Sequence, residues 1–201
     1  MRDPEYIPAV AREVVKLVKA THGHTAVLFT SYKTLNAVYE LVEDELSSYP
    51  LIKMSRSNKN AISQFKESGN GVLFASGSMW EGVDCAGDIL SSVIIVRLPF
   101  PLRTQTMEFK KKACVNTKEF VQKYAVPQMI IKLRQGAGRL IRTEADTGIL
   151  AILDARAAQD GAYRTRVLKA LRKYPLIDSV NGAATFIDSV KDDSYGKEDN
   201  A

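Results

Sequence analysis

The chain has 201 residues and a mass of 22.2 kDa, a length that predicts one large domain or a domain with a small appendage. Hydrophobic residues at 45% and charged residues at 25% are ordinary for a soluble globular protein, and the net charge of +5 favours an anionic partner. Two cysteines and two histidines exclude a disulfide-rich fold and predict no metal site. The absence of a long apolar run or a signal-peptide pattern predicts a cytoplasmic protein without a membrane partner.

Apolar periodicity predicts helices that alternate with five short apolar strands. The expected helices span residues 8–21, 34–48, a short stretch around 61–65, 104–141 with a break at Pro127, and 162–173. The expected strands span residues 26–29, 51–54, 72–75, 93–96 and 149–153. This alternation predicts an α/β fold, in which a mainly parallel sheet of at least five strands carries helices on both faces.

Ligands of such sheets bind at the carboxyl ends of the strands. That rule selects the loops at 30–33, 76–84 and 97–101, and the helix after residue 127, as the candidate site.

The segment Gln135-Gly-Ala-Gly-Arg-Leu-Ile-Arg142 has the strongest chemical signature. On a continuous α-helix, Gln135, Arg139 and Arg142 would form one polar stripe opposite an apolar face. Two glycines inside a helix cost about 1 kcal/mol each, which suggests the close approach of a ligand or another backbone near Gly138. Arginine forks suit phosphate oxygens, so the segment predicts a phosphate-facing helix; a packed helix with surface salt bridges is the alternative.

The loop Ser76-Gly-Ser-Met-Trp-Glu-Gly-Val-Asp84 is the second candidate. Gly82 permits a tight turn between Glu81 and Asp84, and Asp84 can accept a hydrogen bond from a ribose hydroxyl or simply cap the turn. Trp80 can stack on a base, although packing in a core or between domains is the more common role.

Thr30, Ser31 and Lys33 follow the first strand and suit a phosphate oxygen, while capping of the next helix by Ser31 or Thr34 explains the hydroxyls equally well. The run Lys110-Lys-Lys112 and the basic face of the last predicted helix are most simply solvated surfaces.

In combination these segments resemble motifs of one helicase family. The Ser76–Asp84 loop and the Gln135–Arg142 segment are similar to motifs V and VI of DinG/XPD-type superfamily 2 DNA helicases, and Val27-Leu-Phe-Thr-Ser-Tyr32 looks like motif IV. The Leu-Pro-Phe-Pro segment and the Asp154-Ala-Arg156 turn also resemble DinG relatives.

The resemblance implies the second RecA-like motor domain, a three-layer sandwich over residues 5–190. The polar composition of residues 191–201 predicts a disordered tail. It implies that ATP and Mg²⁺ are shared with a first RecA-like domain, and that single-stranded DNA crosses both domains. Arg139 and Arg142 would be arginine fingers oriented with Gln135, while Glu81, Gly82, Asp84 and Gly138 would lie near the nucleotide. The nucleic acid would meet Thr30, Ser31, Lys33, Ser78 and Trp80.

The sequence contains neither a phosphate-binding loop nor an Asp-Glu-Ala-His-like box, so we expect half of a motor that is inactive alone. An iron–sulfur cluster would belong only to the first motor domain. A stand-alone nucleic-acid-binding or adaptor domain is the main alternative. A Rossmann-type enzyme is disfavoured because no Gly-x-Gly-x-x-Gly follows the first strand.

Overall fold

The computed structural model describes residues 4–55, 57–77, 85, 87–141, 143, 146–177, 179–192 and 195. The strands are β1 (Thr25–Phe29), β2 (Leu51–Lys53), β3 (Val72–Ser76), β4 (Ser92–Ile95) and β5 (Ile149–Ile152). The helices are α1 (Tyr6–Ala20), α2 (Tyr32–Val42), α3 (Ala61–Glu67), α4 (Gln105–Lys112), α5 (Thr117–Phe120), α6 (Val126–Ala137), α7 (Arg164–Ala170) and α8 (Val180–Val190).

All five strands are parallel and lie in the order β2-β3-β1-β4-β5, which confirms the predicted parallel sheet. Every residue of β1, β3 and β4 is buried, as continuous apolar runs predict for strands covered on both faces. Thr25 of β1 pairs with Val72 on one side and Ser92 on the other, so the three central strands begin level with one another.

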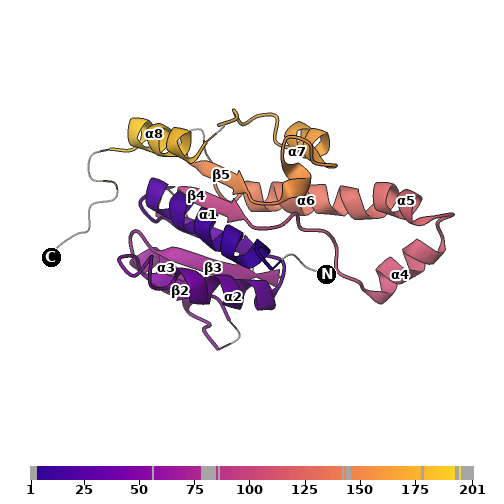
Figure 1. The fold of residues 1–201 in the computed structure, drawn as a ribbon, viewed down its shortest axis with the longest axis horizontal. Helices are drawn as coiled ribbons and strands as arrows, with labels where there is room; N and C mark the ends of the chain where they lie inside the picture. Colours follow the sequence, from indigo (N-terminus) through magenta and orange to yellow (C-terminus); the bar gives the residue numbers. More distant parts are fainter. Residues whose placement is uncertain are drawn as a thin grey trace.

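Successive strand residues point to opposite faces of the sheet and contribute to two hydrophobic cores, one on each face. The molecule therefore has three layers (Figure 1). One core joins Val27, Phe29 and Ile94 to α1 and α2. The other joins Leu28 and Ile95 to α3, α6 and α7. These layers are those of an α/β sandwich, as the sequence predicts.

The long helical region before β5 differs from the prediction at both Pro127 and its end. The helix continues through Pro127, because a π-helical turn at Val121–Ala125 precedes it and the Val126 N–H reaches the Val121 carbonyl. The interruption lies instead between α4 and α5, and both helices extend away from the sheet (Figure 1).

The helix α8 was not predicted from the sequence. Ser179 caps it, since its Oγ accepts a hydrogen bond from the Gly182 N–H at 3.0 Å, and Ala183 and Ile187 pack against Ile149 of β5. Gly182 and several β-branched residues weaken its helix propensity, so packing rather than propensity accounts for it. Just beyond it, Lys191 and Tyr195 contact the body of the domain, in the tail that we expected to be disordered.

Candidate functional site at two edges of the sheet

The predicted site residues lie at opposite edges of the sheet. Thr30, Ser31 and Lys33 directly follow β1 and therefore lie at the carboxyl edge. Leu140 lies at the amino edge, because a Cβ on Gly148 would come within 2.7 Å of its Cδ1 and within 2.5 Å of the Ser91 carbonyl. Ser91 and Gly148 immediately precede β4 and β5. Arg139, next to Leu140, thus belongs to the amino edge.

The expectation that the helix after residue 127 joins the other segments at the carboxyl edge is wrong for the C-terminal end of that helix, which leads to Arg139. The chain leaves β4 through α4 and α5, and α6 then runs back along the sheet (Figure 1). A helix that precedes a parallel strand must return the chain to the amino edge. The rule that ligands bind at the carboxyl ends of the strands therefore did not predict the position of Arg139.

The predicted helical stripe of Gln135, Arg139 and Arg142 is also wrong. The helix α6 ends at Ala137 with Gly138 as its C-cap, and the N–H groups of Arg139 and Leu140 bond three residues back, to the carbonyls of Gly136 and Ala137. Such bonds form a tighter turn than an α-helix, and glycine favours helix termination. Gln135 is exposed on the last helical turn, whereas Arg139 is half-buried in the turn that follows.

At the carboxyl edge, Ser31 is the N-cap of α2. Its Oγ accepts a hydrogen bond from the Thr34 N–H at 3.2 Å and lies 2.9 Å from the Thr34 hydroxyl. The capping interpretation therefore accounts for the Ser31 hydroxyl in this structure. Lys33 is exposed on the first turn of the same helix and Thr30 is half-buried. A phosphate near this helix start would meet an ammonium and the donor end of the helix.

A buried carboxylate connects the loops after β4 and β5. Asp154 is 8% exposed and accepts hydrogen bonds from the Leu98 N–H at 2.9 Å and from the Arg156 side chain at 2.6 and 2.9 Å. The Arg156 guanidinium also lies over the Phe100 ring, 4.8 Å from its centroid. Burial raises the pKa of Asp154, but the hydrogen bonds from Arg156 and Leu98 outweigh it and leave the pKa below its usual value. The sequence pointed to this turn only through its resemblance to DinG proteins.

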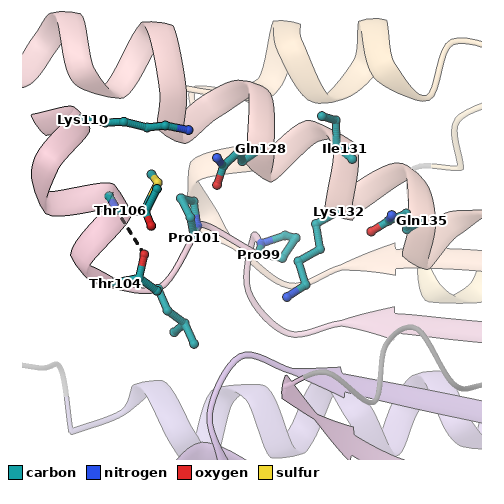
Figure 2. Close-up of a pocket in the computed structure, with 11 residues that line it drawn as sticks. Pro99, Pro101, Thr104, Thr106, Lys110, Gln128, Ile131, Lys132 and Gln135 are labelled. Carbon is teal, nitrogen blue, oxygen red and sulfur yellow. Dashed lines mark hydrogen bonds between the residues drawn. The ribbon is translucent and has the colours of Figure 1, made fainter.

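A groove of about 420 Å³ runs between α4, α6 and the proline-rich loop after β4 (Figure 2). Pro99, Pro101, Leu102, Met107 and Ile131 form its apolar lining. Its polar lining consists of Thr104, Thr106, Lys110, Gln128, Lys132 and Gln135. The groove thus brings Gln135 together with two lysines, of which Lys132 was not singled out from the sequence. Ammonium and amide groups beside exposed apolar side chains suit an anionic polymer that also presents flat apolar groups.

Several predicted residues lie outside the described part of the chain. These are Ser78, Trp80, Glu81, Gly82, Asp84 and Arg142. Among the described residues, no cluster of three or more histidine, cysteine, aspartate or glutamate side chains could hold a metal ion. In the same part of the chain, no helix has the length and apolarity needed to cross a bilayer.

Comparisons with known proteins define the class of this domain. A family model described as the helicase C-terminal domain matches residues 14–174. The solved structure of an XPD helicase superposes with a TM-score of 0.68 at 22% identity, over 86% of this chain and 32% of that one. The fold is thus that of a RecA-like helicase domain.

Sequence relatives agree with the family model. The 3′-5′ exonuclease DinG of Bacillus subtilis (strain 168) is 33% identical over 171 residues, which cover 80% of this chain and 18% of DinG. The ATP-dependent DNA helicase YoaA of Escherichia coli (strain K12) is 32% identical over 189 residues, which cover 90% of this chain and 29% of YoaA. The chain belongs to the helicase C-terminal domain family, of the DinG/XPD type, and spans less than a third of the length of either relative.

Proposed function

We propose that this domain is the second motor domain of an ATP-dependent DNA helicase, and that it acts on ATP together with a first RecA-like domain of the same polypeptide. The observation that carries the proposal is the family match over residues 14–174, which includes both the Ser76–Asp84 loop and the Gln135–Arg142 segment. The name of one relative, the ATP-dependent DNA helicase YoaA, supports the same reaction class.

In this proposal Arg139 and Arg142 contact the nucleotide phosphates. Arg139 is half-buried in the turn after α6, and its backbone N–H bonds to the Gly136 carbonyl. A guanidinium near the nucleotide can stabilise charge that develops on the transferred phosphoryl group. Gln135 would orient the fingers or the attacking water, and Glu81, Gly82, Asp84 and Gly138 would line the nucleotide side of the cleft.

The donor set of this domain fits part of a nucleotide site. The guanidinium groups of arginine suit phosphate oxygens. The Mg²⁺ that accompanies ATP requires carboxylate or hydroxyl ligands, and we assign these ligands to the first motor domain. Any iron–sulfur cluster would also belong to that part of the polypeptide.

Single-stranded DNA is the proposed polymer. It would contact Thr30, Ser31 and Lys33 at the carboxyl edge, with Ser78 and Trp80 from the following loop, and we add the groove that contains Lys110 and Lys132. The sequence composition supports this role, because a net charge of +5 attracts phosphates. An adaptor domain that only binds nucleic acid would use the same lysines but would not require the two arginines.

Substitution of the proposed fingers in the intact protein tests the function. Arg139→Lys and Arg142→Lys should each lower kcat of the DNA-stimulated ATPase by roughly 10³-fold, with a much smaller effect on nucleotide affinity, because a finger acts in the transition state. Lysine does not replace the planar fork.

Arg134→Lys is the matched control for both finger variants. Arg134 lies on α6, is exposed, and donates from Nε to the Ala170 carbonyl at 3.3 Å. Steady-state phosphate release and a filter-binding assay on single-stranded DNA should separate loss of hydrolysis from retained DNA binding. Near-normal hydrolysis in both finger variants would contradict the proposal and favour the adaptor.

A further inference from the structure

The positive charge of this chain is concentrated in one stretch, residues 103–132, which contains α4, α5 and the first part of α6. The stretch has Arg103, six lysines and two glutamates, so its net charge of +5 equals that of the whole chain. The remaining residues therefore have no net charge. We call residues 103–132 the basic arm, since α4 and α5 extend away from the sheet (Figure 1).

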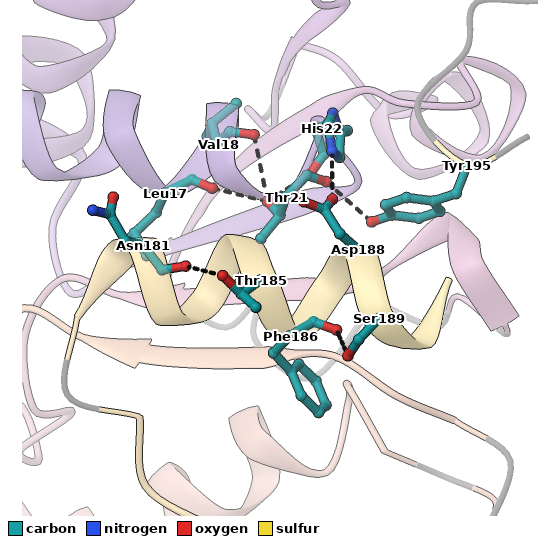
Figure 3. A network of polar contacts seen from close by, with 11 residues as sticks. Leu17, Val18, Thr21, His22, Asn181, Thr185, Phe186, Asp188, Ser189 and Tyr195 are labelled. Carbon is teal, nitrogen blue, oxygen red and sulfur yellow. Dashed lines mark hydrogen bonds and ion pairs between the residues drawn. The ribbon is translucent and has the colours of Figure 1, made fainter. Parts of the chain in front are cut away.

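The lysines of the basic arm are not neutralised by neighbouring carboxylates. None of them forms an ion pair with a residue that the structure describes. Basic groups elsewhere do, as Figure 3 shows for His22, whose Nε2 lies 3.2 Å from Asp188. Lys110 and Lys123 lie instead near the Tyr124 ring, 5.2 and 5.7 Å from its centroid. Unpaired ammonium groups are available to bind phosphates, so the arm suits an anionic polymer.

A second cavity, of about 190 Å³, lies next to the groove, between α4, α5 and the loop after β4. Pro101, Leu102 and Met107 line both the groove and this cavity. The side chain of Leu102 is 71% exposed, so it stands between the two openings at the surface. Pockets for drug-sized ligands have about 300–1,000 Å³, and the second cavity therefore suits a single ring system.

The lining of the second cavity combines aromatic rings with hydrogen-bonding groups. Phe100 and Phe120 supply the rings, while Arg103 and Glu108 supply donors and an acceptor. The Arg156 guanidinium already lies over Phe100, 4.8 Å from its centroid, so we assign stacking to Phe120 on α5. A nucleobase has a π-face for stacking and polar groups on its edge, and it matches this lining.

We propose that the second cavity binds one base of a single strand whose phosphates are bound by the lysines of the basic arm. The proposal rests on the proposed function, because it requires that the domain binds single-stranded DNA. It adds that a base contributes to affinity through Phe120, beside the phosphate contacts in the groove. Stacking tolerates every base, so the affinity should depend on the presence of a base more than on its identity.

Abasic oligonucleotides separate base contacts from phosphate contacts. The 201-residue chain is titrated with two labelled strands of equal length, one of thymidine nucleotides and one of abasic tetrahydrofuran nucleotides, which have the same phosphate charge. The wild-type chain should bind the strand with bases roughly tenfold more tightly. Phe120→Leu keeps an apolar side chain but removes the ring, and it should remove most of this preference.

A second variant and a matched control make the measurement specific to the cavity. Thr117 is exposed at the start of α5 and lines the cavity, so Thr117→Met should fill the space and also remove the preference. Phe109→Leu removes a different ring of the arm, on α4, which is 75% exposed and lines neither cavity. This control should keep the tenfold preference.

Equal binding of the two strands by the wild-type chain would overturn the proposal. A preference that persists in both cavity variants, or that Phe109→Leu reduces equally, would also overturn it. Thr117→Met decides the outcome if Phe120→Leu lowers the melting temperature. Failure of the proposed motor function would appear separately, as near-normal ATP hydrolysis in the Arg139 and Arg142 variants of the intact protein, and a DNA-binding adaptor would retain the base preference.

Discussion

At the scale of single residues, the loops on both edges of the sheet are held by a few buried contacts. Asp154 fixes the carboxyl edge, because its two oxygens accept hydrogen bonds from the loop after β4 and from Arg156. Gly148 fixes the amino edge, because any Cβ there would come within 2.5 Å of the Ser91 carbonyl. These residues hold the backbone next to the side chains for which we propose a function.

Asp154→Asn should destabilise the domain by about 1–3 kcal/mol at neutral pH. The amide is neutral, so the ion pair with Arg156 is lost, and its NH₂ group is a donor that would face other donors, the Leu98 N–H or the Arg156 guanidinium. The folded-state pKa of Asp154 is lowered, so its stabilising effect is present above the unfolded value of about 3.9 and is lost as the pH falls through the folded pKa. Urea unfolding of wild type and variant should therefore differ at pH 7 and converge in acid.

The control for this prediction is Asp188→Asn, whose carboxylate lies on the surface beside His22. It should change stability by less than about 1 kcal/mol. A deficit in Asp154→Asn that persists undiminished in acid would show that charge is not the cause.

At the scale of elements, α6 connects the two halves of the site. Its outer face lines the groove with Gln128, Lys132 and Gln135, and its C-terminal turn presents Arg139 at the amino edge. On the inner face of the same helix, Leu133 and Ala137 are packed in the core. The helix thus extends from the groove that we propose for nucleic acid to the turn that contains Arg139.

The groove prediction concerns the two lysines on α4 and α6. Lys110→Ala with Lys132→Ala should weaken binding of the chain to single-stranded DNA. The slope of log affinity against log salt should also fall, by about 0.7 for each phosphate that the protein no longer neutralises. Fluorescence anisotropy of a labelled oligonucleotide at several salt concentrations measures both effects.

A charge-matched control removes two exposed lysines elsewhere, Lys16 on α1 and Lys66 on α3. This double variant has the same net charge as the groove variant but should retain most of the affinity and the slope. Equal losses of affinity in the two double variants would show that the groove has no special role and that only overall charge matters.

At the scale of the whole molecule, the domain forms one parallel sheet with two cores but supplies only one side of the proposed nucleotide site. The family match and the length of the relatives are consistent with a domain that works beside another. The exposed side chains of Leu102 and Ile131 beside the groove leave apolar surface that such a partner or a nucleobase could cover.

We therefore expect the chain alone to hydrolyse no ATP above background, because a phosphate-binding loop and Mg²⁺ ligands contribute most of the binding contacts for a nucleotide. Phosphate release by the purified chain, with and without single-stranded DNA, measures this directly. Robust turnover that disappears in Arg139→Lys would instead reveal a complete site within this chain.

The α/β class, the parallel sheet and the family resemblance follow from the amino-acid sequence alone. Continuous apolar strands and amphipathic helices have a periodicity that depends only on local geometry, so five strands were found close to their observed bounds. The motif residues were recognisable for a similar reason, since their order along the chain does not depend on packing.

Which residues share an edge of the sheet, in contrast, depends on tertiary packing. The position of Leu140 beside Gly148 and Ser91, and the burial of the Lys191 side chain beside Thr147 and Asp88, depend on contacts between segments that are distant in sequence. Local propensity does not encode such contacts, and for that reason the sequence did not predict the amino-edge position of Leu140 or the contacts of Lys191.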